Sequence, residues 1–404
     1  MFLSQVPTTP GLAVTQISDL QPAQAKKTCL DVGWSEELVA KTNFNDDAQN
    51  MMQSGQVDVV VEATGNPVVG VTHARIAIQN GLHIVMVNVE ADVLAGALLA
   101  HEARQAGVVY SMAYGDQPAL TCELVEWARS CGFDVVAAGK GTKYLPAYHT
   151  STPDTVWDHY GLNALQAAEA GMNSQMFNSF LDGTKSALEM AAIANATGLA
   201  APEDGLQFPP AGMDDLAQVL RPIDEGGQLS GKGQVEVVSS IERDDRPVYK
   251  DLRWGVYVVL EAPNDYAAAC FRQYGMNTDS TGRYSAMYKP FHLIGLELNM
   301  SIFSAALLSS PTGSTQNFGA DVVACAKRDL AAGEILDGEG GFTVWGKLLP
   351  ASRSLSIGGL PIGLSDKVKL KNNIKAHQPI CWDDVEFDQS NTAVVIRRKM
   401  ESMQ

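Results

Sequence analysis

The feature that most constrains the fold is the alternation of short apolar runs with helical patterns in the first third of the chain. The run Val57-Asp-Val-Val-Val-Glu-Ala-Thr64 is rich in β-branched residues and ends at Gly65-Asn66-Pro67. Such a run is typical of a strand that is buried on both faces and stopped by a turn. Because a strand, a turn and a helix follow one another three times, the pattern predicts an α/β fold with a doubly wound parallel sheet.

The elements expected in this part are strands over 12–18, 57–64, 82–88 and 108–112 and helices over 22–31, 71–80 and 94–106. A dinucleotide-binding fold also carries G-x-G-x-x-G after its first strand. This sequence lacks that motif, and residues 1–6 resemble the tail of the helix that would follow it. Either the chain is truncated before this first strand, which we favour, or another element takes the strand's place.

The remainder of the chain changes character twice. The second part is expected to hold strands over 134–138, 234–238 and 254–260, helices over 177–197 and 293–308, and a surface excursion over 205–232. From residue 320 onward, short strands and charged turns predict a small β module with little helix. We therefore divide the chain into a first domain (1–132), a second domain (133–319) and a third domain (320–404).

Composition excludes several classes of protein. With 46 acidic and 29 basic side chains, the formal net charge of −17 disfavours nucleic acid as a partner. No secretory segment is visible, and no apolar run reaches the ~20 residues that a bilayer requires, so we expect a soluble, cytoplasmic protein. The six cysteines form no C-x-x-C pair, and we expect reduced thiols rather than a zinc or redox site.

Five residues are candidates for contact with a nicotinamide cofactor. Asp19 ends the second strand of the expected fold, where a carboxylate accepts hydrogen bonds from the adenosine ribose and disfavours a 2′-phosphate. Ala63, Thr64 and Gly65 form the turn after a central strand, and Asn88 ends the next strand. Open α/β sheets bind their ligands at this carboxyl edge. Asp19 and Asn88 also have structural alternatives, a solvated carboxylate for Asp19 and a turn-capping amide for Asn88.

Four charged residues are candidates for catalysis. Lys140 and Lys143 lie in the Gly-rich segment Gly139-Lys-Gly-Thr-Lys143, which we expect to form a turn in which both ammonium groups converge on an anionic or carbonyl substrate. Lys185 and Glu189 are four residues apart on a helix, so they share one face, and the alternative is a surface ion pair.

Polar and aromatic residues elsewhere are second-tier candidates. Tyr284, Tyr288, Lys289 and His292 form the densest such cluster outside the first domain, and we expect it to line the substrate site. His149 and Tyr160 are proton-transfer groups by type, but such residues are more often structural.

The motifs together resemble a known family. Val57 to Gly65 with Val85-Met-Val-Asn88 resembles the nucleotide-binding domain of homoserine dehydrogenases. Four further segments look like the deoxyxylulose-phosphate reductoisomerase-like (DRL) family: 88–92, 115–118, 138–144 and 176–185. Residues 326–336 and 374–385 are similar to the two halves of a C-terminal SAF β-clip. The resemblance implies a Rossmann domain, a substrate and dimerisation domain, and a SAF domain.

The resemblance also implies an activity. Members of this family reduce 1-deoxy-D-xylulose 5-phosphate to 2-C-methyl-D-erythritol 4-phosphate for isoprenoid biosynthesis, with NADP(H) or NAD(H) as cofactor and Mg or Mn as a candidate metal. It implies a cofactor at Ala63, Thr64, Gly65 and Asn88 and a substrate near Lys140 and Lys143. Asp116 and Glu189 are the expected acidic groups. Glu189 stands where homoserine dehydrogenases carry a catalytic lysine, which makes homoserine oxidation unexpected; Lys185 lies one turn earlier.

Two other functions remain open. One is a homoserine-dehydrogenase-like dehydrogenase or reductase of a sugar, sugar acid or other hydroxy compound in carbohydrate catabolism. The other is a nucleotide- or sugar-binding protein without turnover. Asp19 favours NAD, whereas the reductive chemistry of the family favours NADP. The expected partners are a small phosphorylated or acidic sugar and a second copy of the chain in a homodimer.

Overall fold

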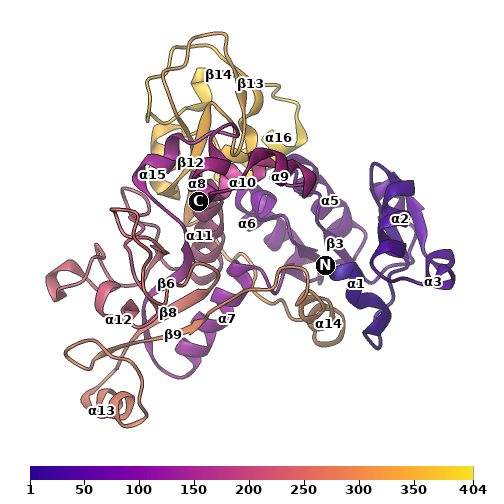
Figure 1. Cartoon of the computed structure of the whole chain (residues 1–404). Helices are drawn as coiled ribbons and strands as arrows, with labels where there is room; N and C mark the ends of the chain where they lie inside the picture. The colour runs from indigo at the N-terminus through magenta and orange to yellow at the C-terminus, as the bar shows by residue number, and fades with distance from the viewer. Residues whose placement is uncertain (404) are drawn as a thin grey trace.

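The predicted strand and helix pattern builds a parallel sheet of order β3-β4-β5, from β3 (Val59–Glu62), β4 (His83–Met86) and β5 (Tyr110–Met112). Helices α5 (Pro67–Gln79) and α6 (Val89–Ala106) pack against one face of this sheet, and α14 (Asn299–Leu308) packs against the other. The structure, a computed structural model, describes residues 1–403 (Figure 1). The prediction of a mixed α/β fold with a parallel sheet is therefore confirmed.

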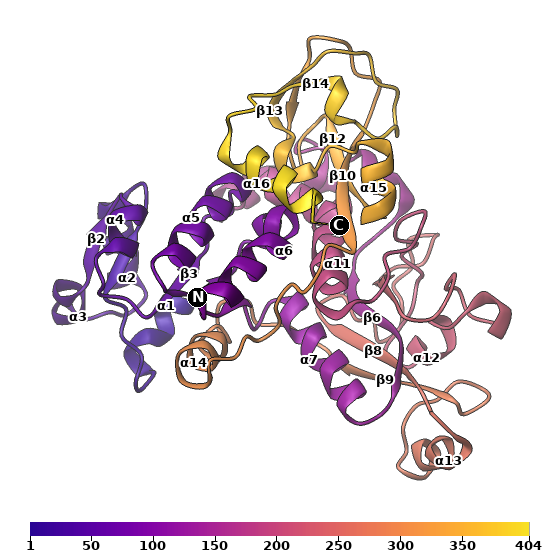
Figure 2. The same ribbon diagram turned by 180° about the vertical axis from the view of Figure 1, so that it is seen from behind.

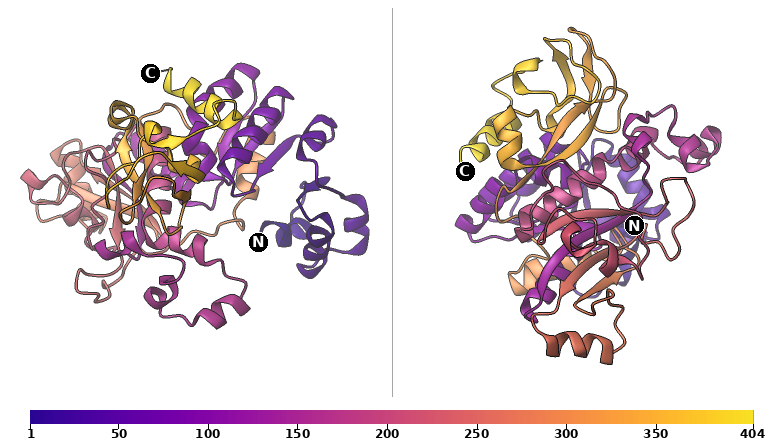
Figure 3. Two further views of the ribbon diagram at one scale, coloured as in Figure 1. Left: turned by 90° about the horizontal axis from the view of Figure 1, so that it is seen from above. Right: turned by 90° about the vertical axis from the view of Figure 1, so that its left-hand side faces the viewer.

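The first two strands form a sheet of their own instead of joining β3. Strand β1 (Gln16–Ser18) pairs in parallel with β2 (Asn43–Asn45), and no strand among residues 1–403 pairs with both β1 and β3. The helices of this lobe are α1 (Phe2–Gln5), α2 (Pro22–Asp31), α3 (Glu36–Lys41) and α4 (Ala48–Gln53). Figures 1 and 3 show the lobe beside β3 and α5, projecting from the rest of the molecule.

A second sheet of order β7-β6-β8-β9 occupies the middle of the chain. Its strands are β6 (Asp134–Thr142), β7 (Gln234–Ser239), β8 (Val256–Glu261) and β9 (Tyr284–Lys289). Helices α7 (Gln117–Ser130) and α11 (Thr184–Thr197) cover one face, as Figure 2 shows for α7. The other face is covered by residues 205–232, including α12 (Leu216–Val219).

Residues 205–232 are not the surface excursion that their Pro, Gly and Asp content predicts. Leu216, Leu220 and Leu229 are each at most 1% exposed and pack against the sheet. The composition correctly predicts that this segment has little regular structure. It does not predict whether the segment is exposed, because a few leucines suffice to hold an irregular segment against a sheet face.

The predicted turn at 139–143 is also wrong, because β6 continues through it to Thr142. Lys140 lies opposite Val237 on one neighbouring strand and Val256 on the other. The glycines allow close backbone contact: a Cβ atom at Gly139 would overlap the carbonyl oxygen of Glu236, and one at Gly141 would overlap that of Leu252. These glycines therefore serve strand packing rather than a turn.

The predicted helix over 177–197 is two helices, α10 (Ser174–Leu181) and α11. The break falls at Gly183, whose φ of 91° lies in the left-handed region that favours glycine. Short helices lie in the connections of the second sheet: α8 (Val156–Tyr160) and α9 (Ala164–Glu169) lie between β6 and α10, and α13 (Asp265–Gln273) lies between β8 and β9.

Residues 320–403 contain five strands and two α-helices. The strands are β10 (Ala320–Ala326), β11 (Ile335–Asp337), β12 (Val344–Pro350), β13 (Asp366–Leu370) and β14 (Val385–Glu386), and the helices are α15 (Ala351–Ile357) and α16 (Thr392–Glu401). Strand β10 pairs with β12, and β13 lies between β11 and β14. The expectation of little helix missed α16, whose fully buried Arg397 forms an ion pair with Asp321 of β10. The SAF assignment stays a prediction.

Helix α11 is the element around which the other parts assemble. It contacts α6 and α7, strand β7 of the second sheet, and β10 and β12 of the C-terminal part. The main hydrophobic core runs without interruption through all of these elements. Side chains on α11 can therefore meet residues that lie far apart in sequence.

Two simpler expectations can also be compared with the structure. All six cysteines are free; three of them are buried, whereas Cys131 is exposed. Within the described part of the chain, every helix is too short or too polar to cross a membrane.

Candidate active site

Two charged residues of α11, Lys185 and Glu189, lie one turn apart on a buried face of the helix. Nζ of Lys185 lies 2.5 Å from Oε1 of Glu90, in the first turn of α6. Glu189 instead forms an ion pair with Lys140 of β6. Lys185 and Glu189 are therefore not the surface pair that their spacing alone allows, because each binds a partner on a different element.

The ion pair between Lys140 and Glu189 is almost completely buried, with side chains 8% and 4% exposed. Lys140 also donates a hydrogen bond of 3.1 Å to Oε1 of Gln117, at the start of α7. An ammonium group has three N–H donors. Since these two are its only partners among residues 1–403, one N–H of Lys140 remains for a further acceptor.

Asp116 caps the N-terminus of α7 beside this pair. Its Oδ1 accepts a hydrogen bond of 2.8 Å from the backbone N–H of Gln117, whereas its buried Oδ2 has no hydrogen-bond partner within residues 1–403. Burial and the neighbouring charge of Glu189 raise the pKa of Asp116 to about 6. Asp116 and Glu189, the two acidic groups predicted from sequence, therefore lie close enough to influence each other.

Carboxylates outnumber ammonium groups in this cluster. Although burial alone would lower the pKa of Lys185, the charges of Glu90, Glu189 and Asp116 raise it above its ordinary value. Glu339, from the loop between β11 and β12, is a fourth carboxylate, and burial together with Glu90 raises its pKa. Elements of all three parts of the chain thus contribute to one polar cluster at the N-termini of α6 and α7.

The turn predicted to contact the cofactor is exposed, and the buried side-chain amide of Asn88 holds it in place. Ala63, Thr64 and Gly65 are exposed, with open space where a Cβ of Gly65 would lie. Asn88 is only 2% exposed and caps α6 by accepting the N–H of Ala91. Its Nδ2 donates a hydrogen bond of 2.9 Å to the carbonyl of Asn66, which fixes the turn beside the start of α6.

Asp19 lies apart from this turn, in the lobe that contains β1 and β2. It is exposed, and its Oδ1 accepts a hydrogen bond of 2.7 Å from the backbone N–H of Gln21 at the start of α2. The structure therefore keeps this carboxylate accessible but does not join it to the cluster around α11.

Lys143 does not converge with Lys140. Its Nζ donates a hydrogen bond of 2.5 Å to the carbonyl of His159 in α8. Burial and the nearby charge of Arg253 lower the pKa of Lys143. Because alternate residues of a strand face opposite sides, an interval of three residues sends the two lysines to different neighbours.

The second-tier residues are dispersed. Tyr288 lines a cavity of about 310 Å³ with Met213 and Met287, whereas Tyr284 is buried against Glu225. His292 is held by the carbonyl of Trp254 at 2.7 Å, and its charge acts on Asp116. Of the four residues expected to line the substrate site, only His292 acts on the cluster, through Asp116. Tyr284 and Tyr288 have other neighbours, and Lys289 forms an ion pair with Glu123. Asp116, the other second-tier residue, is part of the cluster itself.

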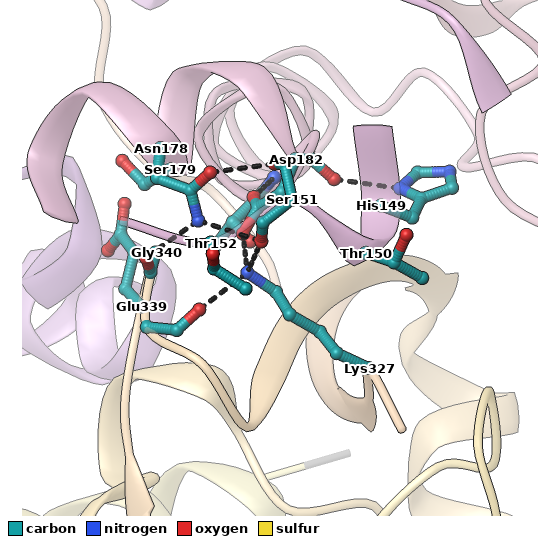
Figure 4. A network of polar contacts seen from close by, with 12 residues as sticks. His149, Thr150, Ser151, Thr152, Asn178, Ser179, Asp182, Lys327, Glu339 and Gly340 are labelled. Carbon is teal, nitrogen blue, oxygen red and sulfur yellow. Dashed lines mark hydrogen bonds and ion pairs between the residues drawn. The ribbon is translucent and has the colours of Figure 1, made fainter. Parts of the chain in front are cut away.

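The sequence did not reveal a buried polar network beside α11 (Figure 4). Nζ of Lys327 lies 2.8 Å from Oδ2 of Asp182, and it donates to the carbonyl oxygens of Ser151 and Gly341. Asn178 donates to the carbonyl of Gly340 at 2.8 Å. The network joins the break between α10 and α11 to the loop that carries Glu339.

His149 also borders this network, through a hydrogen bond of 2.7 Å to the carbonyl of Asp182 and a stack on Trp345. Tyr160 lies under the guanidinium of Arg253. No group of three or more His, Cys, Asp or Glu side chains within residues 1–403 has the arrangement of a metal site.

Three comparisons place this chain among known proteins. A search of curated proteins gives no match. Among solved structures, a probable dehydrogenase from Thermotoga maritima is 12% identical, covering 77% of this chain and 86% of its own, with a TM-score of 0.37. The WlbA dehydrogenase from Bordetella pertussis, in complex with NADH and UDP-GlcNAcA, is 18% identical over 34% and 41% of the two chains, with a TM-score of 0.24. Levoglucosan dehydrogenase, in complex with NADH and levoglucosan, is 12% identical over 71% and 61%, with a TM-score of 0.30.

At such low TM-scores, these superpositions say nothing specific about the chain. The family model is more informative: residues 115–298 match "Oxidoreductase DRL, catalytic domain". This span begins just before α7 and contains Asp116, Gln117, Lys140, Lys185 and Glu189. The match supports an oxidoreductase whose catalytic domain carries most of the buried cluster described above.

Proposed function

We propose that this protein is a nicotinamide-dependent oxidoreductase that reduces the carbonyl group of a sugar phosphate. The first candidate is the conversion of 1-deoxy-D-xylulose 5-phosphate to 2-C-methyl-D-erythritol 4-phosphate. The observation that carries the proposal is the buried ion pair of Lys140 and Glu189, which leaves one N–H of the ammonium without a partner. The family match over residues 115–298 supports the same reaction class.

The exposed turn of residues 63–65 is suited to contact the nicotinamide half of a dinucleotide cofactor. Ala63, Thr64 and Gly65 present accessible backbone with open space above Gly65, and Asn88 holds this turn at the carboxyl edge of the sheet. These residues would hold the nicotinamide end of the cofactor, which supplies a hydride when bound. The sequence contains no Gly-rich loop for the pyrophosphate, so no residue is assigned to that group.

Lys140 is suited to activate the carbonyl. Its free N–H would donate a hydrogen bond to the carbonyl oxygen, and the ammonium would transfer a proton to that oxygen as the carbonyl carbon accepts hydride. Glu189 stabilises the charged ammonium before the transfer, and Gln117 fixes its direction. A positioned acid of this kind typically contributes a factor of about 10²–10⁴ to the rate.

Asp116 is suited to accept a proton. The rearrangement that precedes reduction in this family requires the removal of a hydroxyl proton from the substrate. With a pKa of about 6 and an oxygen without a partner in the described chain, Asp116 is ionised at neutral pH and has room for that proton. Glu189, which already binds Lys140, is less available for this step.

The charge of the cluster favours a second candidate substrate. Two ammonium groups, Lys140 and Lys185, face the four carboxylates Glu90, Asp116, Glu189 and Glu339. An excess of carboxylates suits the hydroxyl groups of an unphosphorylated sugar or another polyol better than it suits an anion. A dehydrogenase of such a compound is therefore the alternative.

A direct assay distinguishes the two candidates. The full chain is incubated with NADPH or NADH and either deoxyxylulose phosphate, 1-deoxyxylulose or a panel of sugar acids, and oxidation of the cofactor is followed by absorbance. We expect turnover only with the phosphate ester. Turnover restricted to unphosphorylated compounds would support the second candidate, and no turnover with any of them would contradict both.

A further inference from the structure

A cavity of about 170 Å³ lies on the far side of α11 from the candidate active site. It is lined by His149, by Ala187 of α11, by residues 204–206 and 208, and by residues 345–348 of β12. Ala187 is two residues from Lys185 and two from Glu189, which is about 200° around a helix. The cavity and the buried ion pairs therefore lie on opposite faces of α11, so this site is distinct from the one assigned to the proposed reaction.

Three aromatic side chains of the lining belong to one connected group of stacked rings. The rings of His149 and Trp345 stack with their centroids 3.9 Å apart. The ring of Phe208 stacks on that of Tyr144 with a centroid distance of 3.8 Å. His149 donates from Nδ1 to the carbonyl of Asp182 at 2.7 Å (Figure 4) and accepts the hydroxyl of Tyr144 at Nε2, at 2.9 Å. Rings fixed in this way present planar apolar surface that need not be ordered when a ligand binds.

The backbone of Phe208 has a conformation that is unusual for a bulky residue. Its φ of 51° lies in the left-handed region. Arg243 stabilises this conformation by donating to the carbonyls of Gln207 and Phe208 at 2.9 Å and 3.0 Å. Backbone strain of this kind is concentrated at functional sites, so it supports a binding role for this wall of the cavity.

Lys347 lines the same cavity without a carboxylate partner. It is half-buried, and among residues 1–403 its ammonium group forms no ion pair and no hydrogen bond. By contrast, the buried Lys140, Lys185 and Lys327 each bind a carboxylate. Asp204, the acidic residue of the lining, is exposed and does not pair with Lys347. The ammonium group of Lys347 therefore remains available to an anionic ligand.

A second donor of the lining also lacks a partner. Nε1 of Trp345 is buried and has no hydrogen-bond acceptor within the described chain. Buried polar groups are almost always hydrogen-bonded, so an unpaired indole N–H beside a cavity indicates an acceptor from outside the chain. An ammonium group and an indole N–H together suit a carboxylate, which accepts hydrogen bonds and carries the opposite charge to lysine.

We infer that this cavity binds a small aromatic carboxylic acid. Apolar cavities of about 150 Å³ hold one benzene ring, and this cavity is slightly larger. The planar ring would lie against Phe208 and Trp345, and the carboxylate would bind Lys347. A cationic aromatic ligand is disfavoured because it would meet the unpaired ammonium group. The inference concerns a separate site and does not depend on the proposed function.

Isothermal titration calorimetry with the full chain tests this inference, with benzoate as probe. At constant ionic strength, benzoate is compared with benzyl alcohol, which lacks the charge, and with cyclohexanecarboxylate, which lacks the planar ring. We expect wild type to bind benzoate at a single site and each of the other two compounds about tenfold or more weakly. No binding of benzoate, or equal affinity for benzoate and either of the other compounds, would overturn the inference.

Two lysine variants test the role of the charge. Lys347→Met removes the ammonium group, and Lys371→Met is the control, because Lys371 is an exposed cation just after β13 that has no ion pair among residues 1–403 and lies outside the cavity lining. The Kd for benzoate should rise about tenfold or more in Lys347→Met and stay within about twofold of wild type in Lys371→Met. The Kd for benzyl alcohol should change in neither. Equal Kd values for benzoate in all three proteins would contradict the site.

Tryptophan fluorescence tests the position of the ring. With benzoate at a concentration that saturates each protein, a ring against Trp345 should change the emission of wild type. Trp345→Phe, which keeps an aromatic ring at this position, should lose that change. An equal change in wild type and Trp345→Phe would place the ligand elsewhere and overturn the inference.

Discussion

Lys140 of β6 and Glu189 of α11, which are 49 positions apart in sequence, form a buried ion pair. Gln117 of α7 completes the contacts of the ammonium. The pair joins three elements of the candidate catalytic domain. Taking two charges out of water is costly, and a buried pair is often no more stabilising than apolar residues would be. Its presence is therefore better explained by chemistry than by stability.

The energetics of this pair can be measured by a double-mutant cycle. Lys140→Met or Glu189→Gln alone leaves one buried partner without compensation and should lower the free energy of unfolding by about 3–5 kcal/mol. The double variant Lys140→Met/Glu189→Gln removes both charges and should recover much of that loss. Urea denaturation of the four proteins gives the coupling energy. Additive losses would show that the two residues do not act as a pair.

The glycines of β6 should tolerate no side chain. In Gly139→Ala the new Cβ would overlap the carbonyl oxygen of Glu236, so neighbouring strands must separate, and the free energy of unfolding should fall by more than about 2 kcal/mol. Gly231→Ala is the matched control, because its Cβ would meet no atom within 4 Å and its φ is not positive. Chemical denaturation checks both variants; equal effects would mean that Gly139 is not needed for close packing.

The stability of the protein should fall as pH rises toward neutrality. Burial raises the pKa of Glu236 to about 7, against the opposing hydrogen bonds from the N–H groups of Val237, Gln207 and Phe208. Because the fold binds this proton more tightly than the unfolded chain, the stabilisation is complete below the ordinary pKa of 4.5 and is lost as pH rises to about 7. The slope contributed is at most about 1.4 kcal/mol per pH unit.

Glu236→Gln mimics the protonated carboxyl group and should flatten that dependence. Wild type, Glu236→Gln and the exposed control Glu203→Gln are unfolded with urea at several pH values between about 5 and about 8, a range that includes the pKa of Glu236. Wild type and control should share the steeper decline. Asp92 and Asp116, whose pKa values burial raises to about 6, and Glu339, whose pKa burial also raises, contribute to it in the same direction. A Glu236→Gln curve parallel to wild type would show that this carboxyl group is not the source.

The ion pair of Lys327 and Asp182 should hold the C-terminal part against α11 (Figure 4). Lys327→Met leaves Asp182 buried without its cation and should cost about 3–5 kcal/mol. Lys375→Met is the control, because its pair with Asp329 is exposed and contributes about 1 kcal/mol or less. Hydrogen exchange in residues 337–341 should accelerate in the first variant alone. Unchanged exchange there would show that Lys327 does not anchor this loop.

Local patterns predicted the elements of the first sheet well. The run 57–64 and its closing turn became β3 and the start of α5, and the spacing of Lys185 and Glu189 correctly placed both on one helix face. These predictions succeed because strand burial and helix periodicity depend on residues that are close together in sequence.

What the sequence could not predict depends on contacts between distant residues. The glycines around Lys140 looked like a turn because their reason, the approach of the Glu236 and Leu252 carbonyls, lies on other strands. The surface ion pair that the sequence left open for Glu189 does not form, because the partner of Glu189 is Lys140, which is carried by β6. In each case a single sequence gives the residue type but not its neighbour.

The most direct test of the account is the rate of hydride transfer with Lys140 replaced. Pre-steady-state oxidation of NADPH by deoxyxylulose phosphate is compared between wild type and Lys140→Met, with Lys140→Met/Glu189→Gln included so that an unstable single variant does not decide the outcome. If Lys140 is the acid at the carbonyl, both variants should be slower than wild type by about 10²–10⁴-fold while their native fold is retained. A folded variant without Lys140 that transfers hydride within about threefold of the wild-type rate would contradict the account.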